Sequence, residues 1–271
     1  MKKKSYTLLI IGSILLIASI TTAVITYNSS YAESLLIEDA AEKLPKQRPY
    51  AYSLAFVFLS FLLTLKGIFN AVFGVKEHEK TDVKTIAQTG LMAALCYIGF
   101  ALFKIDIPVG TEKTAFHFGN VFCVLAALLL GGYRGGLAGA IGMSIGDLTT
   151  SYVTSAPKTF ILKFLIGYIV GFVAHNIFKL NKAHSHRYVT GVTIGSSATG
   201  MLFNIIADPL VGYLYKTYLL GIPQDLAKTL AKLNFATTTV NAVVAIVMAS
   251  IFYLALRIPL RKTGIIPEEE Q

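Results

Sequence analysis

The chain of 271 residues is poor in charged residues, has only two cysteines and contains no tryptophan. Charged residues make up 14% of it, whereas a soluble globular domain carries about a quarter. This deficit argues against an ordinary soluble domain. Cys96 and Cys123 both fall inside apolar runs, so we expect no disulfide framework of the kind that stabilises small secreted domains.

Motifs for nucleotide hydrolysis, metal-dependent cleavage and covalent catalysis are also missing. The glycine-rich sequence GGYRGG at 131–136 lacks the G-K-[ST] ending of a phosphate-binding loop. No H-E-x-x-H sequence or nucleophile–base arrangement stands out, and His184 and His186 in KAHSHR are typical of a solvated basic loop. We therefore expect no ATPase site, metal or cofactor, and we expect a protein that is not an enzyme.

Apolar sequence is what the chain has in excess, with 54% hydrophobic residues. Several apolar runs reach about 20 residues, the length of a helix that crosses a bilayer. We predict an all-α polytopic membrane protein in which a six-helix bundle is preceded by two extra transmembrane helices. The eight expected spans cover residues 6–27, 51–74, 83–104, 117–132, 134–152, 158–179, 188–216 and 234–258.

The net charge of +9 is distributed at the ends of these runs, which is the positive-inside bias of a membrane protein and not a nucleic-acid site. Placing Lys2, Lys3 and Lys4 inside assigns the remaining connections alternately to the two sides. The expected cytoplasmic segments are 75–82, 131–135, 180–187 and 259–271. The expected external segments are 28–50, 105–116, 153–157 and 217–233, the last with a short surface helix in GIPQDLAKTLAKL.

Composition divides the chain into four parts. Residues 1–74 form a two-span extension, 75–82 a charged cytoplasmic linker, 83–260 the six-helix domain and 261–271 a cytoplasmic tail. The first span also resembles a secretory signal that ends at Ala32. Its apolar core is long for a signal, so an uncleaved anchor is the favoured alternative.

Two opposite charges fall at the same depth of the predicted bundle. Asp147 lies about five residues below the outer end of one span, and Lys163 about five residues down the next. At a rise of 1.5 Å per residue both are about 8 Å below the same edge. They either form a structural ion pair or face one cavity, because charged residues within a membrane usually face a partner or a cavity.

Other polar residues gather in the outer halves of the spans, whereas the inner halves are apolar. This asymmetry predicts a binding pocket that opens outward, although each asparagine could instead bond between helices, His117 could mark the interface, and Asp208 before Pro209 could bend a helix. The candidate substrate-binding residues are His117, Asn120, Asp147, Tyr152, Lys158, Lys163, Asn204 and Asn241.

Small residues predict close packing in two places. Gly135, Gly139, Gly142 and Gly146 lie on one helix face, where a neighbouring backbone can approach. Gly90 and Ala94 form a second small-xxx-small pair. It serves either packing within the bundle or docking to another membrane protein.

Residues 83–258 resemble the substrate-binding S components of energy-coupling-factor (ECF) transporters, in the riboflavin-transporter-type group. The motifs are H-x-G-N at 117–120, the glycine-rich hairpin, an acidic residue before a short external loop, and A-P-x-T-F-x-x-K at 156–163. The extension at 1–74 departs from the typical pattern, in which the chain starts at the first core span.

The resemblance implies a six-helix protein of the bacterial plasma membrane that binds a vitamin or vitamin precursor and relies on a T component and two cytoplasmic ATPases. Flavins, pyrimidines and pyridoxine-like compounds are all compatible cargo, and Tyr152 could stack on a ring. Gly90 and Ala94 match the family's A-x-x-x-A motif, which contacts the T component. A stand-alone ion-coupled carrier of a small heterocycle is the alternative, with Asp147 or Asp208 as the ion site.

Overall fold

The computed structural model describes residues 2–34, 36–37, 46–57, 60, 63–64, 82–110, 112–182 and 185–263. They divide into two compact units, each described by itself below. One comprises Met1–Asp82 with Ser151–Pro157, and the other comprises Val83–Thr150 with Lys158–Gln271. His184, most of the expected linker 75–82 and most of the expected tail 261–271 lie outside the described residues.

The first unit is built on two helical segments that contact each other closely. Helix α1 (Lys2–Thr26) continues through η1 (Tyr27–Tyr31) and α2 (Ala32–Ser34), and residues 46–57 are also helical. A Cβ atom added to Gly12 would lie 2.8 Å from the backbone nitrogen of Thr64, so the glycine allows this approach. The hydroxyls of Thr26 and Ser53 are 2.9 Å apart. The described parts of these two segments therefore pack together, whereas residues 58–59, 61–62 and 65–74 of the expected second span lie outside the described residues.

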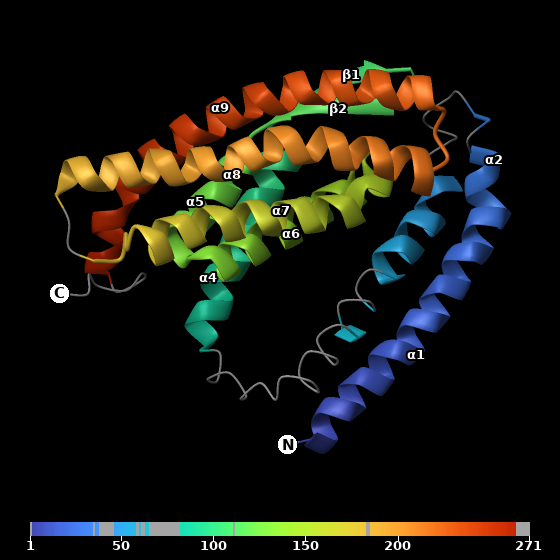
Figure 1. The fold of residues 1–271 in the computed structure, drawn as a ribbon, viewed down its shortest axis with the longest axis horizontal. Helices are drawn as coiled ribbons and strands as arrows, with labels where there is room; N and C mark the ends of the chain where they lie inside the picture. The colour runs from blue at the N-terminus through green and yellow to red at the C-terminus, as the bar shows by residue number, and fades with distance from the viewer. Residues whose placement is uncertain are drawn as a thin grey trace. The chain divides into compact units, whose positions relative to one another are not determined.

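The second unit contains the remaining long helices and one β-hairpin (Figure 1). Among the described residues, five helices are long and apolar enough to cross a membrane: Leu9–Ser34 in the first unit, and Val83–Ala101, Val153–Ile177, His186–Leu219 and Gln224–Lys262. The elements are α4 (Val83–Ala101), β1 (Lys104–Val109), β2 (Glu112–His117), α5 (Gly119–Leu130), α6 (Gly132–Thr149), η2 (Val153–Ser155), α7 (Ala156–Gly171), η3 (Phe172–Ile177), α8 (His186–Leu214), η4 (Tyr215–Leu219) and α9 (Gln224–Lys262).

The hairpin corrects the all-α prediction, because it occupies the segment 105–116 that was expected to be a plain external connection. Its strands pair antiparallel from Lys104 opposite His117 to Val109 opposite Glu112. Alternating residues in KIDIPV favour a strand. Gly110 has φ +58°, a conformation that glycine adopts readily in a two-residue turn. His117 accordingly lies at the end of a strand and not at the start of a helix.

Two further expectations about the helices need correction. The segment 217–233 is not a separate surface helix, because α9 runs without interruption from Gln224 to Lys262. Helix α5 has 12 residues, and its length of about 18 Å is shorter than the hydrocarbon core of a bilayer. Helix α8 continues through Pro209, so this proline does not end it.

Glycines on α6 form the closest packing of the unit. Cβ atoms added at Gly135 and Gly139 would lie 2.3 Å from atoms of α5, namely the Ala127 Cα and the Cys123 Sγ. At Gly142 the added atom would lie 2.1 Å from the carbonyl oxygen of Ala93 on α4. The glycine stripe predicted for helix packing is confirmed, and it places α6 directly against both neighbours.

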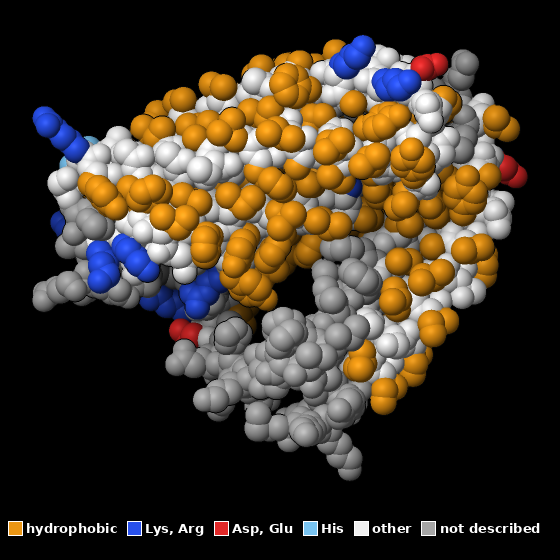
Figure 2. Space-filling model, in the orientation of Figure 1, with side chains coloured by type: hydrophobic (Ala, Val, Ile, Leu, Met, Phe, Trp, Pro, Cys, Tyr) orange, Lys and Arg blue, Asp and Glu red, His pale blue; other side chains and the backbone are white. Residues whose placement is uncertain are grey.

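The outward-facing surfaces of α8 and α9 are apolar. Figure 2 shows hydrophobic side chains over the middle of the visible face and charged ones toward its ends. Exposed apolar residues recur on both helices, as expected for helices that face lipid. They include Leu202, Ile206, Leu210, Val243, Val247 and Ile251.

Candidate functional site

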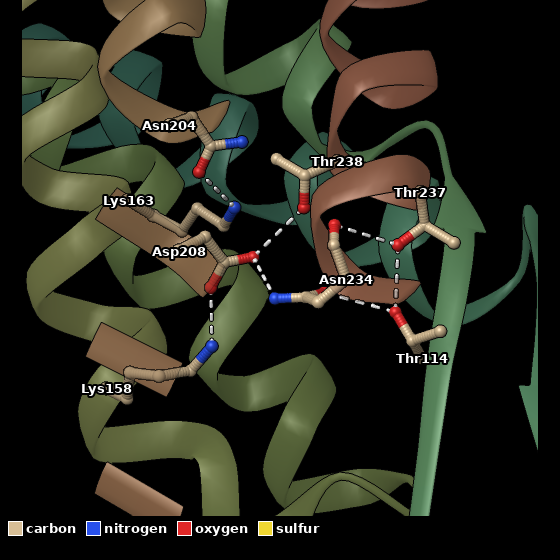
Figure 3. A network of polar contacts seen from close by, with 8 residues as sticks. All are labelled: Thr114, Lys158, Lys163, Asn204, Asp208, Asn234, Thr237 and Thr238. Atoms are coloured by element: carbon tan, nitrogen blue, oxygen red, sulfur yellow. Dashed lines mark hydrogen bonds and ion pairs between the residues drawn. The ribbon is translucent and has the colours of Figure 1, made fainter. Parts of the chain in front are cut away.

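Asp208 is the centre of a polar network that joins α7, α8 and α9 (Figure 3). The Lys158 ammonium donates to Asp208 Oδ1 over 2.5 Å. Asn234 Nδ2 and the Thr238 hydroxyl donate to Asp208 Oδ2 over 3.2 and 3.3 Å. With three donors on its two oxygens, the carboxylate is well satisfied, so it holds these parts of the three helices in a fixed arrangement.

The network continues from α9 onto the hairpin through Thr114 of β2. Its hydroxyl lies 3.1 Å from Asn234 Oδ1 and 2.9 Å from the Thr237 hydroxyl (Figure 3). Thr114 and Thr237 are both buried. A buried hydroxyl must be hydrogen-bonded to avoid a desolvation cost, so these contacts fix the position of β2 along α9.

Asn241, one helical turn further along α9, also binds the hairpin. Its Nδ2 donates to the Ala115 carbonyl over 3.0 Å, and its Oδ1 accepts from the His117 backbone N–H over 3.1 Å. At the other end of β2, Lys216 forms a 2.5 Å ion pair with Glu112. The Asn241 amide therefore positions the strand, and its predicted role in substrate binding stays a prediction.

Asp147 and Lys163 are both buried, with 2% and 5% exposure. Within the described residues no ion pair of 4.0 Å or less joins them, so the structural-pair alternative is not what the structure contains. Lys163 instead donates to Asn204 Oδ1 of α8 over 3.5 Å, and the Thr159 side chain is hydrogen-bonded to Asp147. The two groups are close enough to interact electrostatically.

Four of the predicted site residues carry a buried polar atom that has no hydrogen-bond partner among the described residues. Most buried polar atoms in folded proteins are hydrogen-bonded, so such a group of exceptions needs a physical reason. Their chemistry is mixed, since carboxylate and amide oxygens accept hydrogen bonds and an amide nitrogen donates. The atoms are His117 Nδ1, Asn120 Oδ1, Asp147 Oδ2 and Asn204 Nδ2.

The remaining predicted residues have separate locations. Tyr152 lies half-buried in the α6–α7 connection, within the first unit, and its role stays a prediction. Gly90 and Ala94 are exposed on α4, and a Cβ atom on Gly90 would meet nothing within 4 Å. This pair is therefore not used for packing inside the described bundle.

Three contributing residues were missed by sequence reasoning: Thr114, Thr159 and Thr238. Thr238 could have been found, because Asn234, Thr238 and Asn241 recur at the spacing of one helix face. Thr114 gave no such signal, since its segment was expected to be an irregular loop.

Comparison with known families gives one match. Residues 80–258 match the family model described as the ECF-type riboflavin transporter, S component. The chain belongs to this family. No curated protein and no solved structure matches it.

As an S component, the chain is a membrane-embedded substrate-binding subunit of an ECF transporter. The family match begins at residue 80, so the whole N-terminal segment 1–74 lies outside it. Every residue of the Asp208 network and all four residues with unpartnered atoms lie inside it. The candidate site therefore belongs to the part of the S component that defines the family.

Proposed function

We propose that this S component captures a small vitamin or vitamin precursor from the outer side of the membrane. The candidate cargo is a flavin, a pyrimidine or a pyridoxine-like compound. Delivery to the cytoplasm would use a T component and two cytoplasmic ATPases as partners. The observation that carries the proposal is the set of unpartnered buried atoms on His117, Asn120, Asp147 and Asn204.

These unpartnered atoms make ligand binding energetically favourable. Leaving a buried donor or acceptor unpaired costs about 1–3 kcal/mol. A ligand that supplies the complementary groups removes this cost on binding and gains affinity from it. Ligand sites are typically apolar cavities with a few convergent polar groups, and the mixture of donors and acceptors here suits a heterocycle that carries both.

The Asp208 network supports the same proposal in a second way. It fixes α7, α8, α9 and β2 relative to one another without using Asp147 or Asn120. A rigid arrangement around the polar groups lowers the ordering cost that a ligand would otherwise meet. One set of residues would thus hold the helices and the hairpin in place, and a different set would bind the ligand.

Gly90 and Ala94 are proposed as the contact with the T component. Both are exposed, and small residues allow a neighbouring helix to approach closely. Gly90→Leu should reduce co-purification of the T component while ligand affinity stays within about twofold. Gly191→Leu, at another open glycine, is the control. Undiminished assembly of Gly90→Leu would remove this assignment.

The alternative function, an ion-coupled secondary transporter, is less well supported. It needs a carboxylate that can bind a proton or sodium ion, and Asp208 is already bonded to Lys158, Asn234 and Thr238. Of these two aspartates, Asp147 is the one that retains a buried carboxylate oxygen without a partner among the described residues.

Purified protein in liposomes separates the two functions. Without partner subunits, the S component should bind copurified small molecules, identified by mass spectrometry, and should not accumulate them. Accumulation that follows a proton or sodium gradient would overturn the importer proposal and support the carrier.

A further inference from the structure

Two lysines of α7, the largely buried Lys158 and the buried Lys163, differ in their partners. Lys158 contacts the Asp208 carboxylate over 2.5 Å, whereas Lys163 contacts only a neutral amide oxygen, that of Asn204, over 3.5 Å. None of the described carboxylates lies within ion-pair distance of Lys163. Since Asp208 already binds three other donors, it does not supply that contact.

Asp147 is a buried acidic residue that lacks a basic partner among the described residues. Its carboxyl is hydrogen-bonded to the Thr159 side chain, but its Oδ2 is buried and has no partner in the described chain. No described lysine or arginine forms an ion pair with it. The unit thus contains a buried acidic group and a buried basic group, each without an opposite charge in contact.

Asn204 is oriented so that its amide nitrogen adds a hydrogen-bond donor next to Lys163. Its Oδ1 accepts from Lys163, which leaves Nδ2 as a donor without a partner among the described residues. The Lys163 ammonium has three N–H groups, so it retains donors beyond the one aimed at Asn204. Residues of α7 and α8 therefore offer donors, and Asp147 of α6 offers an acceptor.

We infer that the ligand is a basic nitrogen heterocycle that also carries an oxygen, in which a protonated ring nitrogen or an amino N–H donates to Asp147 and the oxygen accepts from Lys163 and Asn204. This inference rests on the proposed function and names its substrate class. Pyridinols and amino-substituted pyrimidine alcohols have this chemistry. Neutral flavins lack the basic nitrogen.

The preference for a basic nitrogen over a neutral N–H follows from burial. An isolated charge is costly to bury unless it is paired and hydrogen-bonded. A protonated ring nitrogen gives Asp147 a counter-charge while the ligand oxygen accepts a hydrogen bond from Lys163, whereas a neutral ligand leaves Asp147 without a counter-charge. A site can also select among ligands by leaving the wrong one with unpaired buried groups.

Binding by the wild-type protein tests the ligand class. Isothermal titration calorimetry on the purified full chain would use three probes: pyridoxine, 4-amino-5-hydroxymethyl-2-methylpyrimidine and riboflavin. We expect one of the first two to bind at least tenfold more tightly than riboflavin. Tightest binding of riboflavin would overturn this inference and leave the proposed function intact. Binding of none of the three would overturn both.

Substitutions test the named contacts. Asp147→Asn and Lys163→Met should each weaken binding of the tighter of the two basic probes at least tenfold, as expected for hydrogen bonds to charged groups. Thr149→Val is the matched control on α6, because that hydroxyl bonds only its own helix at Ile145 and Gly146. Unchanged affinity in Asp147→Asn would overturn the assignment of the basic nitrogen.

A ligand analogue keeps the test valid if a variant fails to fold. Replacing the basic nitrogen of the probe by C–H should weaken its binding to the wild-type protein at least tenfold. The same analogue should bind Asp147→Asn and the wild type equally. An analogue that binds the wild-type protein as tightly as its parent would refute the inference.

Discussion

The polar side chains in the two units of this S component differ in their hydrogen-bond partners. In the first unit, hydroxyls mostly bond carbonyls of their own helix, as Thr22 does at Ala18 and Ser60 does at Phe56. In the second, many hydroxyls also bond within their helix, as Thr193 does at Val189, but several buried side chains bond across elements that are far apart in sequence, as Thr114 does at Asn234. The ion pairs differ in the same way: Lys46–Glu33 is exposed, whereas Lys158–Asp208 is largely buried.

The two kinds of hydrogen bond have different structural consequences. A hydroxyl bonded within its own helix needs no neighbour and fixes no geometry. A bond between elements fixes their relative position and is costly to break in a buried location. Among the described residues of the first unit, the Thr26–Ser53 contact joins two helical segments, whereas in the second unit a connected set of such bonds specifies one arrangement of helices and hairpin.

Breaking the Lys158–Asp208 ion pair should lower the stability of the protein more than any other change. Asp208→Leu leaves Lys158 buried without its partner, which typically costs about 3–5 kcal/mol. Thermal unfolding in detergent should show a large fall in melting temperature. Glu33→Gln, at the exposed pair of the first unit, should cost only about 0–1 kcal/mol.

A double variant isolates the cause of that loss. Lys158→Leu combined with Asp208→Leu removes both charges and should recover much of the stability, because replacing a whole buried pair is often neutral. Equal destabilisation by the single and double variants would mean that the ion pair itself is not what matters.

The glycine face of α6 should give the next largest effect. In Gly142→Ala the new Cβ would lie 2.1 Å from the Ala93 carbonyl, so α4 and α6 must separate at a cost of about 1–3 kcal/mol. Gly195→Ala on α8 is the control, since nothing lies within 4 Å of an added Cβ there. Equal melting temperatures of the two variants would contradict the packing role.

Much of this architecture can be read from the sequence, because the bilayer constrains helices strongly. Apolar length located the five described helices that are long enough to cross a membrane, and the glycine spacing identified the tight face of α6. The common depth of Asp147 and Lys163 stays a prediction. Counting gives depth along a helix but not its rotation relative to a neighbour. Lys163 is therefore directed at Asn204 on α8 and not at Asp147.

The hairpin was the least predictable part. Its strands gain stability from contacts with α9 as well as from their own pattern, since Asn234, Thr237 and Asn241 hold β2. A two-stranded ribbon alone is marginal in water. No local signal in 105–116 reports that a helix more than a hundred residues later provides its support.

Weakening the contacts between β2 and α9 should reduce stability less than Asp208→Leu or Gly142→Ala does. Thr114→Val removes the hydroxyl that contacts Asn234 and Thr237, at about 1 kcal/mol per hydrogen bond. Faster hydrogen exchange of the β2 amides should reveal it. Thr239→Val on α9 should leave exchange unchanged, because that exposed hydroxyl bonds its own helix at Phe235. Unaltered exchange in Thr114→Val would show that other contacts suffice.

Removing the extension should have the smallest effect on ligand binding. The family match starts at residue 80, and the Asp208 network and the four unpartnered atoms all belong to the second unit. A chain without residues 1–79 should keep the ligand affinity of the full chain within about twofold, measured by calorimetry. Lys163→Met within the shortened chain should lose affinity as it does in the full one, which verifies that binding uses the same site. A large loss of affinity on truncation alone would mean that the extension contributes to the ligand site, and the contrast between the two units would then be one of packing and not of function.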